Sequence, residues 1–170
     1  MHSRAWCTTV ALVAVLAAGC GGGGAQPTDV VKGMVLASVP LGPGVFDIFT
    51  FCRPVVLQPG TYKRRCSVPW VSELYVGYGE FAPPHKIDRL WRTLRWKAWL
   101  DGNRIDLEAF GSSDRTLYAF PAAGYKDVIV RTFDVTIFTP KPGRHSLRYL
   151  RAAADGTKQD VTWTFTIERR

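Results

Sequence analysis

The sequence has few of the side chains from which metal and redox centres are built. It contains three histidines, four cysteines and two methionines. It holds no Cys-x-x-Cys, His-Glu-x-x-His, Walker or Gly-x-Ser-x-Gly motif. His85 and His145, the histidines well inside the chain, are not at ligand spacing from a cysteine. We therefore predict no metal, no cofactor and no enzyme activity.

Long hydrophobic runs are also missing. The longest apolar segment, from Thr8 to Ala18, is too short to cross a bilayer, which takes roughly 20 apolar residues as a helix. The sequence therefore predicts no transmembrane span. Arg4 precedes this segment, and a short apolar run after a positive charge is typical of a signal peptide.

The segment ends in Leu16-Ala17-Ala18-Gly19-Cys20, which resembles the lipobox of bacterial lipoproteins. The resemblance implies a diacylglyceryl thioether on Cys20, cleavage just before it, and an extracytoplasmic protein that is lipid-anchored to a bacterial membrane. The glycines at 21–24 would form a flexible tether. The alternative is an ordinary secretory signal with an incidental Cys20. We predict a signal peptide over 1–19, the lipidated cysteine and tether over 20–29, and one domain over 30–170.

Cys52 and Cys66 are the cysteines left for other chemistry once Cys7 departs with the signal peptide and Cys20 carries lipid. An even pair in an exported protein predicts a disulfide. Closing such a loop would stabilise the fold by roughly 3 kcal/mol. We expect the pair to face each other on antiparallel strands joined by the turn at 58–60.

The charge of the chain is strongly basic, with a formal net charge of +8. For a membrane-anchored domain this favours contact with anionic lipid head groups or anionic wall polymers. Nucleic acid is a poor partner for a protein outside the cytoplasm. The alternative is an arginine-rich surface with no specific partner.

Alternating residues give the clearest structural pattern. From Val161 to Ile167 every second residue is large and apolar and the others are threonines, which predicts a strand with one buried face. Asp155-Gly156 predicts a hairpin turn from a preceding strand around 145–152. Similar patterns upstream, at 46–57, 61–68, 71–81, 94–100, 105–107 and 128–138, complete a set of seven or eight short strands separated by Gly, Pro and Asp turns. The predicted fold class is an all-β, antiparallel sandwich.

The segment Pro142–Tyr149, its Asp-Gly turn and the strand Val161–Ile167 resemble the last two strands of a bacterial immunoglobulin-like or fibronectin type III-like domain. The resemblance implies an immunoglobulin-like β-sandwich, with the Tyr149 hydroxyl returning to nearby backbone. It specifies the fold and says little of function.

The segment 86–100 combines aromatic and basic residues. We predict a short helical turn around 87–91 and a strand from Thr93 to Leu100, with Trp96 buried and Trp99 exposed. On the outward face Arg95, Lys97 and Trp99 would then form a cationic aromatic strip, with Trp91 and Arg92 nearby. The predicted ligand-binding residues are Trp91, Arg92, Arg95, Lys97 and Trp99.

The strip has two interpretations. It can bind a ligand, or it can be a cation–π ladder that stabilises the sheet by about 0.5–1 kcal/mol per contact. We predict a non-catalytic interaction module for an envelope protein or an envelope polymer such as an anionic glycan. The alternative is a carbohydrate-binding module that uses Trp91 and Trp99. Asp106 and Glu108, two apart on a predicted strand, are interpreted as a charged edge.

Overall fold

The structure is a computed structural model that describes residues 27–53, 58–120 and 125–170. The predicted lipidation site Cys20 lies outside the described residues. Within them no helix has the length and apolar character needed to span a membrane. Strands dominate, and the elements in chain order are β1 (Pro27–Val31), β2 (Met34–Ser38), β3 (Phe46–Asp47), the 3-10 helix η1 (Ile48–Thr50), β4 (Gly60–Val68), β5 (Glu73–Tyr75), β6 (Gly79–Ala82), α1 (Ile87–Thr93), β7 (Arg95–Leu100), β8 (Asn103–Ile105), α2 (Leu107–Phe110), β9 (Ser112–Phe120), β10 (Tyr125–Phe133), β11 (Val135–Phe138), β12 (Gly143–Ala152) and β13 (Lys158–Ile167).

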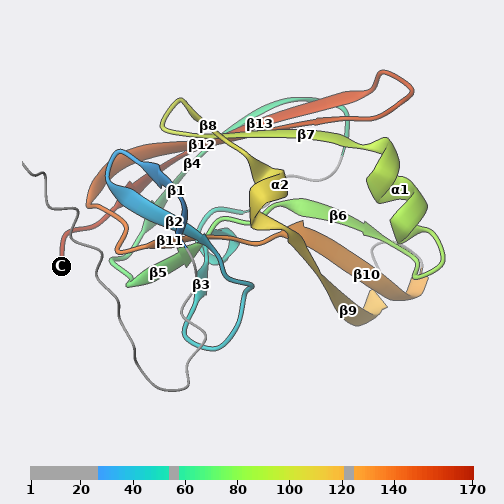
Figure 1. The fold of residues 1–170 in the computed structure, drawn as a ribbon, viewed down its shortest axis with the longest axis horizontal. Helices are drawn as coiled ribbons and strands as arrows, with labels where there is room; N and C mark the ends of the chain where they lie inside the picture. Colours follow the sequence, from blue (N-terminus) through green and yellow to red (C-terminus); the bar gives the residue numbers. More distant parts are fainter. Residues whose placement is uncertain (1–26, 54–57, 121–124) are drawn as a thin grey trace, which may run out of the picture.

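The strands form two layers (Figure 1). The upper layer is one five-stranded sheet in the order β4-β13-β12-β7-β8. The lower layer is divided into a five-stranded sheet, β1-β2-β11-β5-β3, and a three-stranded sheet, β6-β10-β9. The predicted all-β immunoglobulin-like sandwich is confirmed. The described residues hold more strands than the seven or eight predicted. The predicted strands 71–81 and 128–138 are each broken in two, and β1, β2 and β9 lie where no strand was predicted.

Most pairings are antiparallel, as predicted, but two are parallel. β4 runs parallel to β13 over its whole length, and β3 runs parallel to β5. The C-terminal hairpin is as predicted, with β12 and β13 paired in continuous register from Gly143↔Ile167 to Ala152↔Lys158. β1 begins at Pro27, so the sandwich includes the end of the segment 20–29 that was assigned to the tether.

The predicted strand 128–138 is broken at Asp134, where the chain passes from β10 to β11 and from one lower sheet to the other. Opposite this break, β5 and β6 are joined by Val76, Gly77 and Tyr78. The two segments approach closely: the Val76 N–H donates to the Val135 carbonyl at 2.8 Å. A Cβ on Gly79 would lie 1.8 Å from the Arg131 carbonyl oxygen, and one on Gly77 would lie 2.4 Å from that of Phe133. Only glycine fits these two positions.

The core is formed by the inner faces of the two layers. Val161, Trp163, Phe165 and Ile167 of β13 are buried, as the alternation predicted. Tyr78 lies among the rings between the layers, with centroids 5.1 Å from Tyr149 and 5.6 Å from Trp163. Rings packed at these distances add stabilisation beyond the area that they bury.

Hydrogen bonds between buried groups join the two layers. The Tyr149 hydroxyl donates to the Val76 carbonyl, which is 73 positions away in the sequence and not in nearby backbone as the resemblance implied. The Tyr78 hydroxyl donates to Gln159 Oε1 at 2.8 Å. Burial raises the pKa of both tyrosines above the ordinary value, so both remain protonated donors.

The predicted disulfide between Cys52 and Cys66 is present, with Cα atoms 5.2 Å apart. The expected geometry, with the two cysteines facing each other on antiparallel strands, was wrong. Cys52 lies in the turn after η1 and donates its N–H to the Ile48 carbonyl, whereas Cys66 lies on β4, whose only pairing in the described chain is with β13. The bond therefore fastens a turn to the edge of the upper sheet and does not cross two antiparallel neighbours. Residues 54–57 of the predicted strand 46–57 lie outside the described residues.

The tryptophans follow the predicted alternation with one difference. Trp163 is fully buried, and Leu94, Ala98 and Leu100 are buried on the inward side of the β7 segment. Trp96 and Trp99, however, are both half-buried. The sharp contrast predicted between them is absent, because Trp96 borders a surface hollow and Arg148 covers Trp99, with its guanidinium carbon 4.8 Å from the ring centroid.

We predict that Gly79→Ala lowers the free energy of unfolding by about 2–4 kcal/mol, since the added methyl meets backbone that cannot move independently. Gly42→Ala is the matched control, because a Cβ there has nothing closer than the Pro40 carbonyl oxygen at 3.9 Å. Urea unfolding followed by fluorescence measures both. Equal stability for the two variants would contradict the close approach of β6 to β10.

We also predict that Trp163→Ala destabilises the domain by about 3–5 kcal/mol, because it leaves a large cavity among packed rings. Trp99→Ala loses only the stacking of Arg148 and should cost about 1 kcal/mol. Thermal unfolding of both variants checks this. A larger loss for Trp99→Ala than for Trp163→Ala would show that the inward and outward faces of the upper sheet are assigned the wrong way round.

Candidate functional site

The outer face of the upper sheet carries the main concentration of positive charge. Side chains alternate along each strand, so the residues between the buried ones project away from the core. One row crosses all five strands: Arg104 pairs with Trp99, Trp99 with Arg148, Arg148 with Thr162, and Thr162 with Lys63. Because paired residues share a face, these side chains lie side by side.

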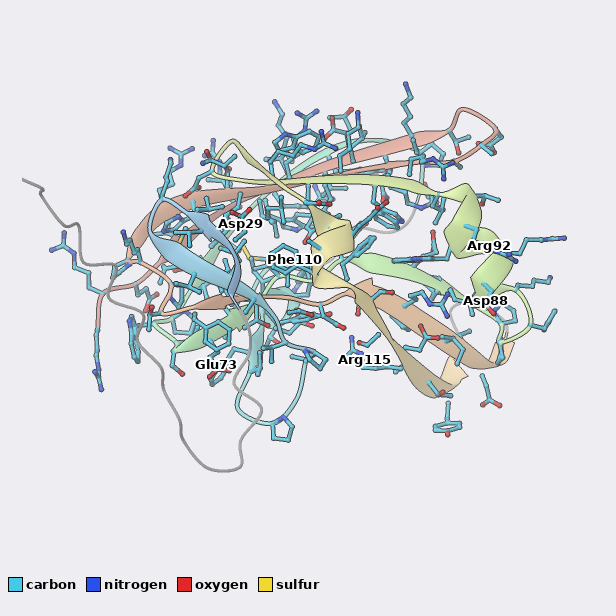
Figure 2. All side chains as sticks on the ribbon, in the orientation of Figure 1. Asp29, Glu73, Asp88, Arg92, Phe110 and Arg115 are labelled. Carbon is cyan, nitrogen blue, oxygen red and sulfur yellow. A yellow bond between two sulfur atoms is a disulfide. The ribbon has the colours of Figure 1, made fainter. Side chains whose placement is uncertain are left out.

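Cations recur along and beside this row. Nitrogen-tipped side chains gather above the sheet in Figure 2. We call the following set the cationic face; all its members are exposed: Lys63, Arg65, Arg95, Lys97, Arg104, Arg144, Arg148 and Lys158. The acids at strand positions of this face are Asp160, half-buried, and Glu168, which follows β13.

Most of these cations have no carboxylate partner. Arg148 is the exception, donating to both oxygens of Asp160 at 2.8 and 2.5 Å. This pair lowers the pKa of Asp160, so the carboxylate stays ionised. Glu168 accepts from the Ser67 hydroxyl at 3.1 Å. Across the described residues, no other member of the cationic face forms an ion pair. The charges of these other lysines and arginines are therefore exposed to solvent.

The spacing of the cations adds their fields together. Residues two apart on a strand, such as Lys63 and Arg65 or Arg95 and Lys97, have Cα atoms about 7 Å apart. This distance is below the Debye length of roughly 8 Å at physiological ionic strength, so neighbouring charges are not screened from one another. The face therefore presents a continuous positive potential that attracts anionic partners.

The residues predicted as one strip do not all lie on this face. Arg95, Lys97 and Trp99 project outward from β7 as predicted. Trp91 is on α1 and packs toward the core, against Trp96 and Phe133 at ring centroid distances of 5.7 and 4.9 Å. Trp91 and Trp99 thus lie on opposite sides of the sheet layer and form no common platform.

For Trp99, the structure favours the cation–π interpretation. Arg148 lies over its ring and is itself held by Asp160. A half-buried indole covered in this way contributes to the sheet surface and leaves the exposed cations as the groups that meet a partner. Asp106 and Glu108 were expected on one strand face, but they lie at the start of α2 and within it.

Sequence reasoning missed the contribution of the edge strand β4. Lys63 and Arg65 were predicted on a strand, but nothing in their local pattern placed them beside β13. The parallel pairing Thr164↔Arg65 brings them to the same face as Arg95 and Lys97. The run Lys63-Arg64-Arg65 was the signal from which a basic sheet edge could have been predicted.

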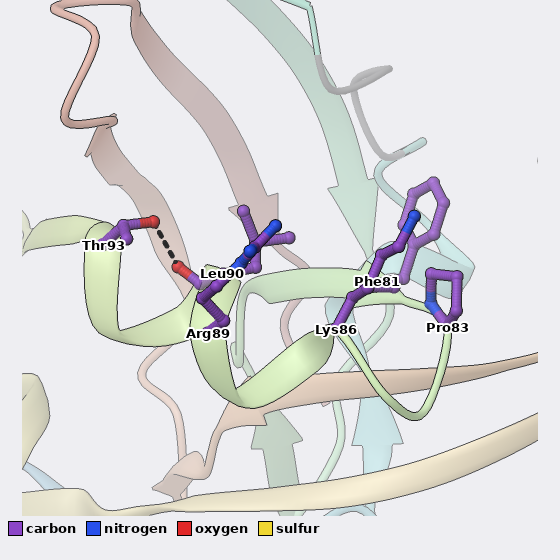
Figure 3. Close-up of a pocket in the computed structure, with 7 residues that line it drawn as sticks. Phe81, Pro83, Lys86, Arg89, Leu90 and Thr93 are labelled. Atoms are coloured by element: carbon purple, nitrogen blue, oxygen red, sulfur yellow. Dashed lines mark hydrogen bonds between the residues drawn. The ribbon is translucent and has the colours of Figure 1, made fainter.

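Helix α1 borders a hollow of about 460 Å³ below the cationic face, lined by Phe81, Pro83, Lys86, Arg89, Leu90 and Thr93 among others (Figure 3). Its helical wall is held by the Thr93 hydroxyl, which donates to the Leu90 carbonyl at 2.7 Å. Lys86, which precedes α1, and Arg89, within it, give this hollow a positive rim, but neither belongs to the sheet.

Within the described residues, the buried histidine and the buried acid Asp134 are held in contacts that join structural elements. No group of histidine, cysteine or acidic residues in the described part of the chain could hold a metal ion. His145 is buried, with Nδ1 2.8 Å from Asp101 Oδ2 and Nε2 2.8 Å from the Lys141 carbonyl oxygen. The first contact joins β12 to the turn after β7, and the second joins β12 to the turn that precedes it, so His145 has a packing role.

Asp134 is buried where β10 meets β11, and accepts from the Tyr75 and Ser113 hydroxyls at 3.1 and 2.9 Å. Burial raises its pKa. These bonds connect the two lower sheets, and we interpret Asp134 as a structural residue.

Comparison with known proteins finds only weak similarities. No protein-family model matches the chain, and no curated protein matches it. Two solved structures are similar in part. One is PbICP-C in complex with falcipain-2, with 12% identity over 68% of this chain and 95% of that chain and a TM-score of 0.35. The other is the cysteine protease inhibitor EhICP2 from Entamoeba histolytica, with 8% identity over 65% of this chain and 100% of that chain and a TM-score of 0.31. At this level of similarity neither structure assigns a ligand or partner to this chain.

Proposed function

We propose that this chain is a lipid-anchored envelope lipoprotein whose β-sandwich is a non-catalytic binding module for an anionic envelope polymer. The single observation that carries the proposal is the cationic face: exposed lysines and arginines on all five strands of one sheet, with most of their charges unpaired in the described chain. A flat, extended surface of one sign suits an extended polymer of the opposite sign better than it suits a compact small molecule.

The polymer interpretation also fits the other side chains of the face. Thr162, Thr164 and Thr166 lie between the cations of β4 and those of β12 and β7. Hydroxyls offer both a donor and an acceptor, so they can bond to the phosphate, carboxylate or hydroxyl groups of a glycan. Among the described residues of this face no large apolar patch accompanies the charges, since Leu150 and Trp99 are only partly exposed. A dry protein–protein interface would need more apolar surface at its centre.

The lipid anchor would hold the domain close to these polymers. A domain held at the membrane by acyl chains on Cys20 meets a high local concentration of wall or surface polymer. The anchor and the cationic face act on different parts of the envelope, so each is testable without the other.

We predict that Cys20→Ser abolishes acylation and releases the protein from the membrane when it is expressed in a bacterium that processes lipoproteins. The serine hydroxyl cannot replace the thiol in the thioether. Mass spectrometry of the N-terminus and fractionation of cells measure the two effects. A variant that is still acylated and still sediments with membranes would remove the anchor from the proposal.

For the cationic face, we predict that the full chain in neutral detergent binds polygalacturonate and polyglycerol phosphate, and that raising the salt concentration weakens binding. Lys63→Glu with Arg65→Glu should weaken binding by at least about tenfold, because two attractive contacts become repulsive. Lys86→Glu with Arg89→Glu is the matched control: it changes the net charge equally, but at the start of α1. Biolayer interferometry measures all three proteins.

Three outcomes would overturn this function. Equal losses in the two double variants would show a response to net charge alone. Binding of duplex DNA as tight as that of either polymer would show a general polyelectrolyte surface. Preference for vesicles containing phosphatidylglycerol over both polymers would assign the face to the membrane surface instead.

A further inference from the structure

A second hollow lies at the end of the cationic face, between α1 and the segment from β7 to α2. Its volume is about 540 Å³, within the range of sites that hold small molecules. It is the place where the predicted ligand residues Trp91, Arg92 and Arg95 come together, and it adds residues from β8, α2 and β10 that the sequence pattern did not connect with them.

The floor of this hollow is aromatic. Trp91, Trp96 and Phe133 line it and contact one another, with Trp96 and Phe133 ring centroids 6.0 Å apart. Arg131, which is bound by Asp88 and Asp114, lies 5.9 Å from the Trp91 ring centroid and helps to fix that indole. Both tryptophans are half-buried, so part of each ring faces the hollow or the solvent.

The rim of the hollow carries charges of both signs. Arg95, Arg104, Asp106 and Glu108 all line the hollow. Although the signs are opposite, none of these side chains forms an ion pair within the described residues. Arg95 donates to the carbonyls of Arg92 and Leu94 at 3.2 Å, which places its guanidinium at the C-terminal end of α1. The other polar atoms of the rim are free to meet a ligand.

We propose that this hollow binds a single sugar unit that bears a carboxylate or a phosphate. The apolar face of a sugar ring stacks on an indole, the carboxylates of Asp106 and Glu108 accept bonds from ring hydroxyls, and the guanidinium of Arg104 binds the anionic group. A neutral sugar leaves the arginine without a partner, and a bare phosphate leaves the aromatic floor uncovered. The combination therefore selects a ring with a charge attached.

This inference rests on the proposed function, because the unit would be one residue of the anionic polymer. Arg95 and Arg104 belong both to the cationic face and to the rim of the hollow. A polymer lying on the face would therefore place one unit, most simply its end, in the hollow. The cationic face would attract the polymer along its length, and the hollow would recognise one of its sugar units.

The experiment uses the full chain in neutral detergent with short probes that cannot span the face. D-glucuronic acid and glucose 6-phosphate should bind with a Kd on the order of 1 mM, as expected for ligands of this size. Glucose and inorganic phosphate should each bind at least about tenfold more weakly. Changes in tryptophan fluorescence and saturation-transfer NMR measure binding.

Arg104→Ala and Trp91→Leu should each weaken binding of both charged sugars by about tenfold, while Arg144→Ala, on the same sheet face but away from the hollow, is the matched control. Because Arg104 is exposed, its variant tests the site even if Trp91→Leu is unstable. Wild-type affinity in Arg104→Ala, or glucose binding as tight as that of glucuronic acid, would overturn the inference. Phosphate binding as tight as that of glucose 6-phosphate would do the same.

The two proposals fail in different ways. Lys63→Glu with Arg65→Glu should weaken polymer binding by at least about tenfold and leave binding of the short probes unchanged, since neither residue lines the hollow. If the short probes bind but the polymers do not, the proposal for the hollow is supported and the proposed polymer binding by the cationic face is wrong. If the polymers bind but the short probes do not, the proposed polymer binding by the cationic face is supported and the inference about the hollow is wrong.

Discussion

The architecture depends on the close contact between the backbone at Val76–Gly79 and the chain where β10 passes into β11. The glycines at 77 and 79 allow this contact, since any Cβ there would overlap a carbonyl oxygen. The same few residues hold the upper layer in place: the Val76 carbonyl accepts from Tyr149, and the Tyr78 ring packs between Tyr149 and Trp163. Without this close contact, residues 76–79 would not pack against the aromatic side chains at the centre of the upper sheet.

A well-packed inner face leaves the outer face of the upper sheet free for charge. Valines, leucines and aromatic residues on the inward side of β12 and β13 anchor the strands, so the outward positions are not needed for packing. Like charges at these positions repel one another, and the sheet tolerates this because they are exposed to water and counter-ions. Where a large apolar side chain does face outward, as at Trp99, the pair of Arg148 and Asp160 covers it. A surface that gathers unpaired cations against their mutual repulsion is better explained by a partner than by stability.

The parts of the fold that sequence alone predicts are those fixed by local alternation. The hairpin of β12 and β13, the strand at 95–100 and the helical turn before it follow from residues a few positions apart. The break at Asp134 does not, because it is imposed by the distant glycines of the 76–79 segment. The disulfide was found by elimination, although Cys52 lies in a turn and not on a strand. The hollow joins Trp91 to Phe133 and Arg104, and no pattern in a single sequence reveals that contact.

The parallel pairing of β4 with β13 also governs the order in which the chain can fold. Residues 60–68 pair with residues 159–167, so the upper sheet stays incomplete until residues 159–167 have been synthesised. Contacts so distant in sequence are slow to form, because a long loop must close first. The bond between Cys52 and Cys66 spans only 14 positions and needs none of the later residues. An oxidase that forms this disulfide while the chain is still emerging would therefore bond β4 to the turn at Cys52 before β13, the partner of β4, has been synthesised.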